Sequence, residues 1–253
     1  MLLSKKASPN TLIRQDFRIG LVLFKHGFPL EYAYHRPLQE SCALLDINFE
    51  ALWAEVEGLF LRPSVNIPVF SEDSMPALPL LILYLKQTHH DYTRIKLPAL
   101  YEYVKSLKSI ESQRNPNIAR IYSAFCDFKT HLLEHVAFEE EEVFPYIEAL
   151  IKNVESYEAP LPLLQTGKQL TLNQIQGLHK GDDHEAEALR NACLNFEVGP
   201  DHSISYGVFM QELQSLMADL QEHSTLEDAY LFPKAEMLER FYFRKLKFLA
   251  AYN

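Results

Sequence analysis

One motif occurs twice in this chain, and the repeat constrains the fold more than any other feature of the sequence. The pattern His-x3-Glu-x4-Phe-Pro begins at His135 and again at His223, and its glutamates are Glu139 and Glu227. Residues four apart lie on the same face of an α-helix, so an imidazole and a carboxylate can converge on one point from a single helix. Two such helices facing each other would provide most of a binuclear metal site.

Two further histidines extend the repeat into two similar halves. His90 precedes His135 by 45 residues, and His179 precedes His223 by 44. Each half therefore reads as a helix with one histidine, a connection, and a helix with His-x3-Glu. Four helices that point ligands inward form a known type of metal-binding bundle core. The matching spacing supports this interpretation independently of the motif itself.

Composition excludes several classes of function. The chain has 253 residues and a formal net charge of −10, which disfavours a nucleic-acid or anionic-membrane partner. Its three cysteines form no Cys-x-x-Cys pair, so they predict neither a disulfide framework nor a thiolate zinc site. The start of the sequence leads into no apolar stretch like a signal peptide, and no run is long enough for a membrane span. We expect a cytoplasmic protein.

The first part of the chain predicts a small helical module. Phe17–Phe24 is an apolar helical segment, and Gly27 and Pro29 follow it in the order typical of a helix end. Asn48 is a suitable cap for another helix through Trp53. Neither of the two histidines in this part belongs to a catalytic pattern, and we interpret both as surface or packing residues: His26 and His35.

A proline-rich stretch separates this module from the repeat. Residues 61–79 contain four prolines and the polar run Ser71-Glu-Asp-Ser74, a composition typical of a linker. We therefore place a domain boundary near residue 70. The predicted domains are residues 1–70, a small helical N-terminal module, and residues 71–253, a four-helix bundle.

The first bundle helix is predicted over about residues 77–112. His90 lies on an apolar stripe at helical spacing, formed by Leu83, Leu97, Tyr101 and Val104. The neighbouring His89 has a partial stripe of its own, so the pattern alone does not decide between the two histidines. The two-half spacing selects His90.

The second bundle helix opens at Asn115-Pro116 and places Glu139 on its apolar side. A buried carboxylate is expensive unless it is paired, so Glu139 needs a cation or strong hydrogen bonds. We expect its neighbours Glu140 and Glu141 to point elsewhere, into solvent. His131 lies one turn before His135, and it could be a pocket residue, a further ligand or a donor behind the ligands.

The third and fourth helices carry the other half of the site. The third begins near a capping box at Thr171-Leu-Asn-Gln174, and its apolar face lies closer to His179 than to His184. Asp182 falls on the inward side, where it could reach the site or a channel to it. The fourth helix has apolar residues on the face that also holds the second His-x3-Glu pair.

The main alternative is a helical bundle whose histidines are buried and hydrogen-bonded. Four histidines and two glutamates in two matching halves favour a metal instead. Imidazole suits iron, zinc, copper and nickel alike. Six ligands with two carboxylates able to bridge favour a binuclear centre over a single tetrahedral zinc. We favour iron, because a histidine-rich site with open positions can bind dioxygen or nitric oxide.

These motifs, with His90-Asp-Tyr-x5-Pro98, resemble the hemerythrin-type (HHE) domain of the iron–sulfur cluster repair di-iron proteins, also called regulators of cell morphogenesis and nitric-oxide signalling. The resemblance covers nearly the whole chain, because Leu23 through Trp53 resembles the small N-terminal module of that family. It implies an all-α fold, a hemerythrin-like four-helix bundle with a small N-terminal helical domain.

The resemblance also implies a cofactor and a set of ligands. The cofactor would be two iron ions bridged by an oxo or hydroxo group, for which zinc or manganese can substitute. The four histidines and two bridging glutamates of the family correspond to the set chosen by spacing: His90, His135, Glu139, His179, His223 and Glu227.

The implied function is protection or repair of iron–sulfur clusters under nitrosative and oxidative stress, by handling nitric oxide or by supplying iron. The partners would be nitric oxide or dioxygen and an iron–sulfur client protein. The alternative is a non-enzymatic sensor that binds these gases, or an iron store. One feature departs from the family, whose well-studied members carry an adjacent cysteine pair in the N-terminal module. Here the matching stretch is Glu31-Tyr-Ala-Tyr34, and Cys42 stands alone on the next helix.

Overall fold

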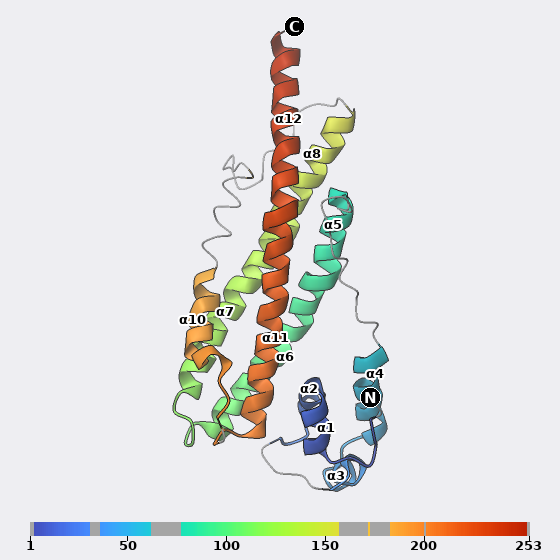
Figure 1. Cartoon of the computed structure of the whole chain (residues 1–253), viewed down its shortest axis with the longest axis vertical. Helices are drawn as coiled ribbons and strands as arrows, with labels where there is room; N and C mark the ends of the chain where they lie inside the picture. Colours follow the sequence, from blue (N-terminus) through green and yellow to red (C-terminus); the bar gives the residue numbers. More distant parts are fainter. Residues whose placement is uncertain are drawn as a thin grey trace. The chain divides into compact units, whose positions relative to one another are not determined.

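A computed structural model describes residues 3–30, 36–61, 77–156, 172, 183–199 and 201–251. All regular structure in these ranges is helical, and none of the described residues lies in a strand (Figure 1). The predicted all-α fold is confirmed. Among the described helices, none is long and apolar enough to span a membrane.

Four short helices form the N-terminal part, and local sequence signals set their ends. They are α1 (Pro9–Gln15), α2 (Arg18–Lys25), α3 (Leu38–Leu44) and α4 (Phe49–Leu61). As predicted, α2 ends before Gly27, whose φ of 77° lies in the left-handed region that glycine adopts most easily. The side chain of Asn48 accepts a hydrogen bond from the Ala51 amide at 3.1 Å, which confirms it as a cap of α4.

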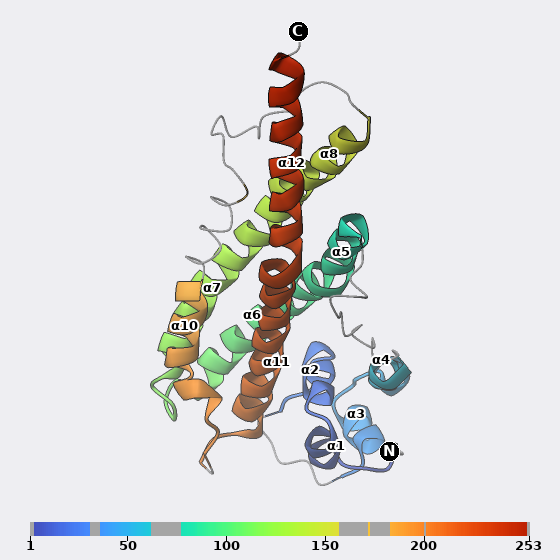
Figure 2. The same ribbon diagram turned by 45° about the horizontal axis from the view of Figure 1, so that its top comes forward.

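Three long helical segments follow, and each contains a short π-helical stretch. The first runs without a break through α5 (Leu78–Tyr84), η2 (Leu85–His90) and α6 (Asp91–Glu111). The second comprises α7 (Ile118–Phe138), η3 (Glu139–Val143) and α8 (Phe144–Ser156). The third comprises α11 (Ile204–Leu226), η5 (Glu227–Leu231) and α12 (Phe232–Ala251), and Figure 2 shows its continuity. Between the second and third lie α10 (Asp183–Ala192) and the 3-10 turn η4 (Leu194–Phe196).

Contacts divide the chain into two compact units that share these long helices. Residues 1–69, 96–123 and 190–216 form the first unit, and residues 70–95, 124–189 and 217–253 form the second. The N-terminal helices thus pack with segments of the long helices in one unit. The predicted division of the chain at residue 70 stays a prediction.

The second unit has a hydrophobic core where α8 packs against α12 and α5 packs against η5. The phenylalanines of both repeated motifs, Phe144 and Phe232, are fully buried in this core. The prediction that Leu83 shares the buried face of His90 is wrong, because its side chain is 47% exposed. The π-helical turn η2 adds a residue between them, so counting seven back at α-helical spacing misses the buried face. The buried residues of this stretch are Leu78, Leu81, Ile82 and Leu85.

Candidate metal centre

Each long helical segment turns from α to π geometry where the predicted ligands lie. His90 ends η2, Glu139 begins η3, and Glu227 begins η5. The amide of Phe144 donates to the carbonyl of Glu139, five residues back, and Phe232 does the same to Glu227. Single π-helical turns of this kind occur frequently at functional sites.

The prolines of the repeated motif explain two of these turns. A proline inside a helix has no N–H for the carbonyl four residues back, and its ring crowds that carbonyl. Pro145 and Pro233 directly follow the residues whose amides make the i−5 bonds. In a π-helical turn, a carbonyl pairs with the amide five residues later instead of four. A turn that ends just before the proline therefore does not need the N–H that proline lacks. The motif therefore determines the backbone at its glutamate as well as the residue types.

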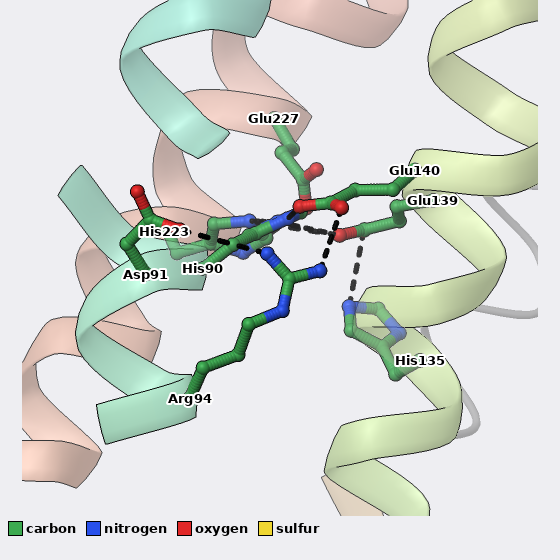
Figure 3. A network of polar contacts seen from close by, with 8 residues as sticks. All are labelled: His90, Asp91, Arg94, His135, Glu139, Glu140, His223 and Glu227. Atoms are coloured by element: carbon green, nitrogen blue, oxygen red, sulfur yellow. Dashed lines mark hydrogen bonds and ion pairs between the residues drawn. The ribbon is translucent and has the colours of Figure 1, made fainter. Parts of the chain in front are cut away.

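Four predicted ligands form one compact cluster. Ligand atoms of His135, Glu139, His223 and Glu227 all lie within 4.8 Å of one another, and the last three residues are buried. Figure 3 shows these side chains together; His135 and Glu139 come from the second long helical segment, and His223 and Glu227 come from the third. The two copies of His-x3-Glu, which are 88 positions apart in the sequence, thus meet in the second unit.

His90 joins this cluster from the first long helix. Its Nε2 atom lies 3.0 Å from Nε2 of His223 and 3.0 Å from Oε2 of Glu139. The other oxygen of Glu139 lies 3.0 Å from Nε2 of His135. Glu139 therefore contacts one imidazole of its own helical segment, His135, and one of the first long segment, His90. A carboxylate that bridges two cations is expected to have such contacts at both oxygens.

Burial disfavours uncompensated charge in this cluster, and a bound cation would compensate the charge of its carboxylates. Burial, reinforced by the nearby carboxylate of Glu139, raises the pKa of Glu227 well above its ordinary value. Burial also lowers the pKa of His223 to about 3, although Glu139 attracts its proton. Neutral imidazoles with free lone pairs next to carboxylates are the donor set that divalent transition metals prefer. The residues present fit a metal centre.

Glu140 corrects the sequence prediction. It was expected to point into solvent, but its Oε1 lies 2.8 Å from Nδ1 of His90, and its Oε2 lies 2.6 Å from Arg94. Arg94 also lies 3.6 Å from Asp91. Burial acts to raise the pKa of Glu140, but the hydrogen bonds from Arg94 and His90 outweigh it and hold that pKa below its usual value.

A cavity of about 90 Å³ lies beside the cluster and is lined by His90, His135 and His223. His131 and Glu185 also line it, and their side chains are 3.6 Å apart. Of the three roles left open for His131, the structure supports that of a pocket residue. The cavity offers room for a molecule of a few atoms next to the candidate ligands.

His89 is as deeply buried as His90 but contacts other groups. Its Nδ1 lies 3.1 Å from Asp219, and its ring meets that of His223 edge to face at 5.5 Å between centroids. The apolar pattern of the sequence did not decide between the two neighbours, and the two-half spacing predicted His90 as the ligand. The structure brings both into the interior and places His90 against the carboxylates.

The third predicted helix is only partly described. His179 and Asp182 lie outside the described residues, so the structure does not test their predicted positions. His184 lies at the start of α10 and is exposed. The sequence stretch Glu31-Tyr-Ala-Tyr34 lies outside the described ranges as well, whereas Cys42 is fully buried in α3.

The chain is similar to known proteins over most of its length. Residues 82–235, which include all six predicted ligands, match the family described as Hemerythrin HHE cation binding domain. The iron–sulfur cluster repair protein ScdA of Staphylococcus haemolyticus is 26% identical over 217 residues, which cover 83% of this chain and 89% of that protein. The iron–sulfur cluster repair protein YtfE of Salmonella paratyphi B is 21% identical over 201 residues, which cover 78% of this chain and 82% of that protein.

Proposed function

Because the chain belongs to the hemerythrin HHE cation-binding family, we propose that it carries a di-iron centre and acts in the repair of iron–sulfur clusters under nitrosative and oxidative stress. The observation that carries the proposal is the buried cluster of His135, Glu139, His223 and Glu227, which His90 joins. The names of the relatives, iron–sulfur cluster repair proteins, support the repair role.

The proposed ligands are the six residues of the two sequence halves: His90, His135, Glu139, His179, His223 and Glu227. Glu139 would share its two oxygens between cations, a role supported by the 3.0 Å contact of one oxygen with His90 and of the other with His135. Glu227 fills the same role from the other half, next to His223 at 3.4 Å. Zinc or manganese can occupy the same donors, since imidazole and carboxylate suit these ions as well.

Bound iron would supply a redox-active cation that can take a diatomic gas such as nitric oxide or dioxygen. The protein's own contribution is to hold the ligands in a largely buried cluster and to leave a cavity beside them. The cavity of about 90 Å³ has room for a diatomic molecule next to the proposed ligands. We propose that the protein either consumes nitric oxide at this site or supplies iron to damaged clusters of a client protein.

The N-terminal module is proposed to act through its surface rather than through thiols. Its one described cysteine, Cys42, is fully buried, and burial raises the pKa of its thiol. A buried neutral thiol is a poor nucleophile and a poor metal ligand. Docking to a partner or covering the site is the role that fits residues 1–70.

Metal analysis of freshly purified protein, combined with an optical spectrum, tests the di-iron centre directly. The expected stoichiometry is about two iron ions per chain. A stoichiometry near zero for every transition metal would end the proposal.

Reaction with nitric oxide tests the repair chemistry. Excess nitric oxide is added without oxygen to the reduced protein in the presence of an excess of a chemical electron donor, because each nitrous oxide formed from two nitric oxide molecules consumes two electrons and two protons. Nitrous oxide is measured by gas chromatography against the donor alone, and release of many equivalents per protein supports consumption of nitric oxide. Stoichiometric binding without nitrous oxide favours a sensor. Transfer of iron to an apo iron–sulfur protein, followed by the spectrum of the rebuilt cluster, supports iron supply.

A further inference from the structure

We propose that Glu140 is a positioning residue that holds His90 in the orientation and tautomer needed to bind a metal, and that Arg94 anchors Glu140. The inference rests on the proposed metal centre. It assigns roles to two residues outside the six proposed ligands. Figure 3 shows the guanidinium of Arg94 between Asp91 and Glu140, with His90 close to Glu140.

The contacts of the His90 ring define which nitrogen is available. Its Nδ1 lies 2.8 Å from Oε1 of Glu140, and its Nε2 points into the cluster at 3.0 Å from Glu139. An ionised carboxylate can only accept hydrogen bonds, so Nδ1 carries the proton in this contact. The Nε2 lone pair is then left for a cation. A neutral histidine with the opposite tautomer would present N–H to the site and could not bind metal there.

Glu140 connects two separate helical segments. It extends from η3, while His90 and Arg94 lie on η2 and α6 of the first long helix. One oxygen of Glu140 accepts from His90 and the other accepts from Arg94 at 2.6 Å. With both oxygens engaged, the carboxylate has little freedom to rotate away from the imidazole.

Two consecutive acids of η3 reach the same imidazole at its two different nitrogens. Glu139 contacts Nε2 of His90, and Glu140 contacts Nδ1. Glu141, the next acid, is exposed. This adjacent glutamate is a matched control.

The experiment measures the zinc affinity of the full chain by competition with a chromogenic chelator. Glu140→Ala is compared with wild type and with Glu141→Ala. Loss of a carboxylate behind a ligating histidine typically weakens metal binding about 10–100-fold, so this loss is expected for Glu140→Ala only. Glu140→Gln keeps an acceptor for Nδ1 but loses the charge, and we expect a smaller loss. Arg94→Ala keeps the acceptor and its charge, and we again expect a smaller loss than for Glu140→Ala.

A second readout separates positioning from a structural role. Histidine labelled with ¹⁵N is incorporated into the zinc-loaded protein, and His90 is assigned by its absence from His90→Gln. Wild type and Glu141→Ala should show a downfield, exchange-protected Nδ1–H proton for His90, and Glu140→Ala should lose it. Helix content by circular dichroism and the unfolding midpoint of each metal-free variant verify that the fold is kept.

Equal zinc affinity for Glu140→Ala and Glu141→Ala would overturn the inference, as would a His90 Nδ1–H signal that persists without Glu140. Either result leaves the metal centre itself intact, because wild type still binds zinc. If wild type binds neither zinc nor iron, the proposed function fails, and the positioning role fails with it.

Discussion

The two copies of His-x3-Glu-x4-Phe-Pro share a backbone but differ in their surroundings. In both, the helix changes to π geometry at the glutamate, and the following phenylalanine is buried. The side chain of His135 is 16% exposed, whereas that of His223 is 4% exposed. The residue after the glutamate also differs, because Glu140 binds His90 and Arg94 while Asp228 is exposed.

The difference shows what an internal repeat does and does not encode. Both halves supply an imidazole and a carboxylate to the cluster, and those residues are identical between the copies. The first copy adds an anchored carboxylate behind a histidine from another helix. The second copy contributes the more deeply buried pair, in which burial lowers the pKa of His223 and raises that of Glu227. In the proposed metal centre, the first half would orient a ligand through Glu140, and the second half would supply the histidine that is less exposed to solvent.

Removal of the shared carboxylate is expected to have the largest effect. Glu139→Ala should lose both metals, because Glu139 contacts imidazole nitrogens from all three described histidines of the set, the farthest at 3.7 Å. Glu227→Ala should lose at least one metal. A metal ion present at 1,000 times its Kd stabilises the folded protein by about 4 kcal/mol, and this stabilisation is lost when the metal no longer binds. The loss is measured as a drop in the unfolding midpoint of protein incubated with metal.

The metal-free form of the same variants provides the internal check. Removing a buried carboxylate relieves its desolvation cost, so metal-free Glu139→Ala should unfold at the same temperature as metal-free wild type or higher. Glu148→Ala, an exposed acid in α8, is the control and should change neither form. A drop of equal size with and without metal would mean that Glu139 supports the fold rather than a cation.

The next prediction concerns the histidine that completes the second half. His179→Ala should lower the metal content, because it removes a ligand, whereas His184→Ala should change little, since His184 is exposed in α10. Metal content per chain and the chelator competition assay measure both. If His184→Ala removes the metal and His179→Ala does not, the assignment of the third helix is wrong, and the two halves are less alike than their spacing suggests.

The sequence predicted the elements and the cluster but not its supporting contacts. Helix signals at Gly27 and Asn48 and the His-x3-Glu repeat were sufficient because they act within one or two turns. A helical wheel predicts Glu140 in solvent, because it turns consecutive side chains apart and carries no information on its partners His90 and Arg94, which lie on another helix. The assumption of α geometry throughout placed Leu83 on the buried face. Pro145, six residues after Glu139, is the sequence signal for the π-helical turn. Because the turn adds a residue, helical-wheel positions counted before it do not continue after it.

Substitution of the two phenylalanines of the repeat is expected to have effects of intermediate size. The ring of Phe144 stacks on His90 at 5.5 Å between centroids, and both phenylalanines are buried in the hydrophobic core. Both Phe144→Leu and Phe232→Leu should lose about 1 kcal/mol of stability. Phe144→Leu should also weaken zinc binding, by about 0.5–1.5 kcal/mol or roughly twofold to tenfold, because it removes the ring stacked on His90. Unchanged zinc affinity in Phe144→Leu would show that the stacking does not hold His90.

The smallest effect is expected at Asp228, which occupies in the second copy the position of Glu140. Its charge lies close enough to Glu227 to help raise the pKa of that carboxyl, but its side chain is exposed. Exposed substitutions typically change stability by less than about 0.5 kcal/mol, so Asp228→Asn should change zinc affinity by no more than about twofold. Chelator competition on Asp228→Asn and Glu140→Gln, which each replace an acid by its amide, gives the direct contrast. A tenfold loss for Asp228→Asn would mean that the second half also anchors a ligand from behind, and that the two copies are equivalent in function as well as in sequence.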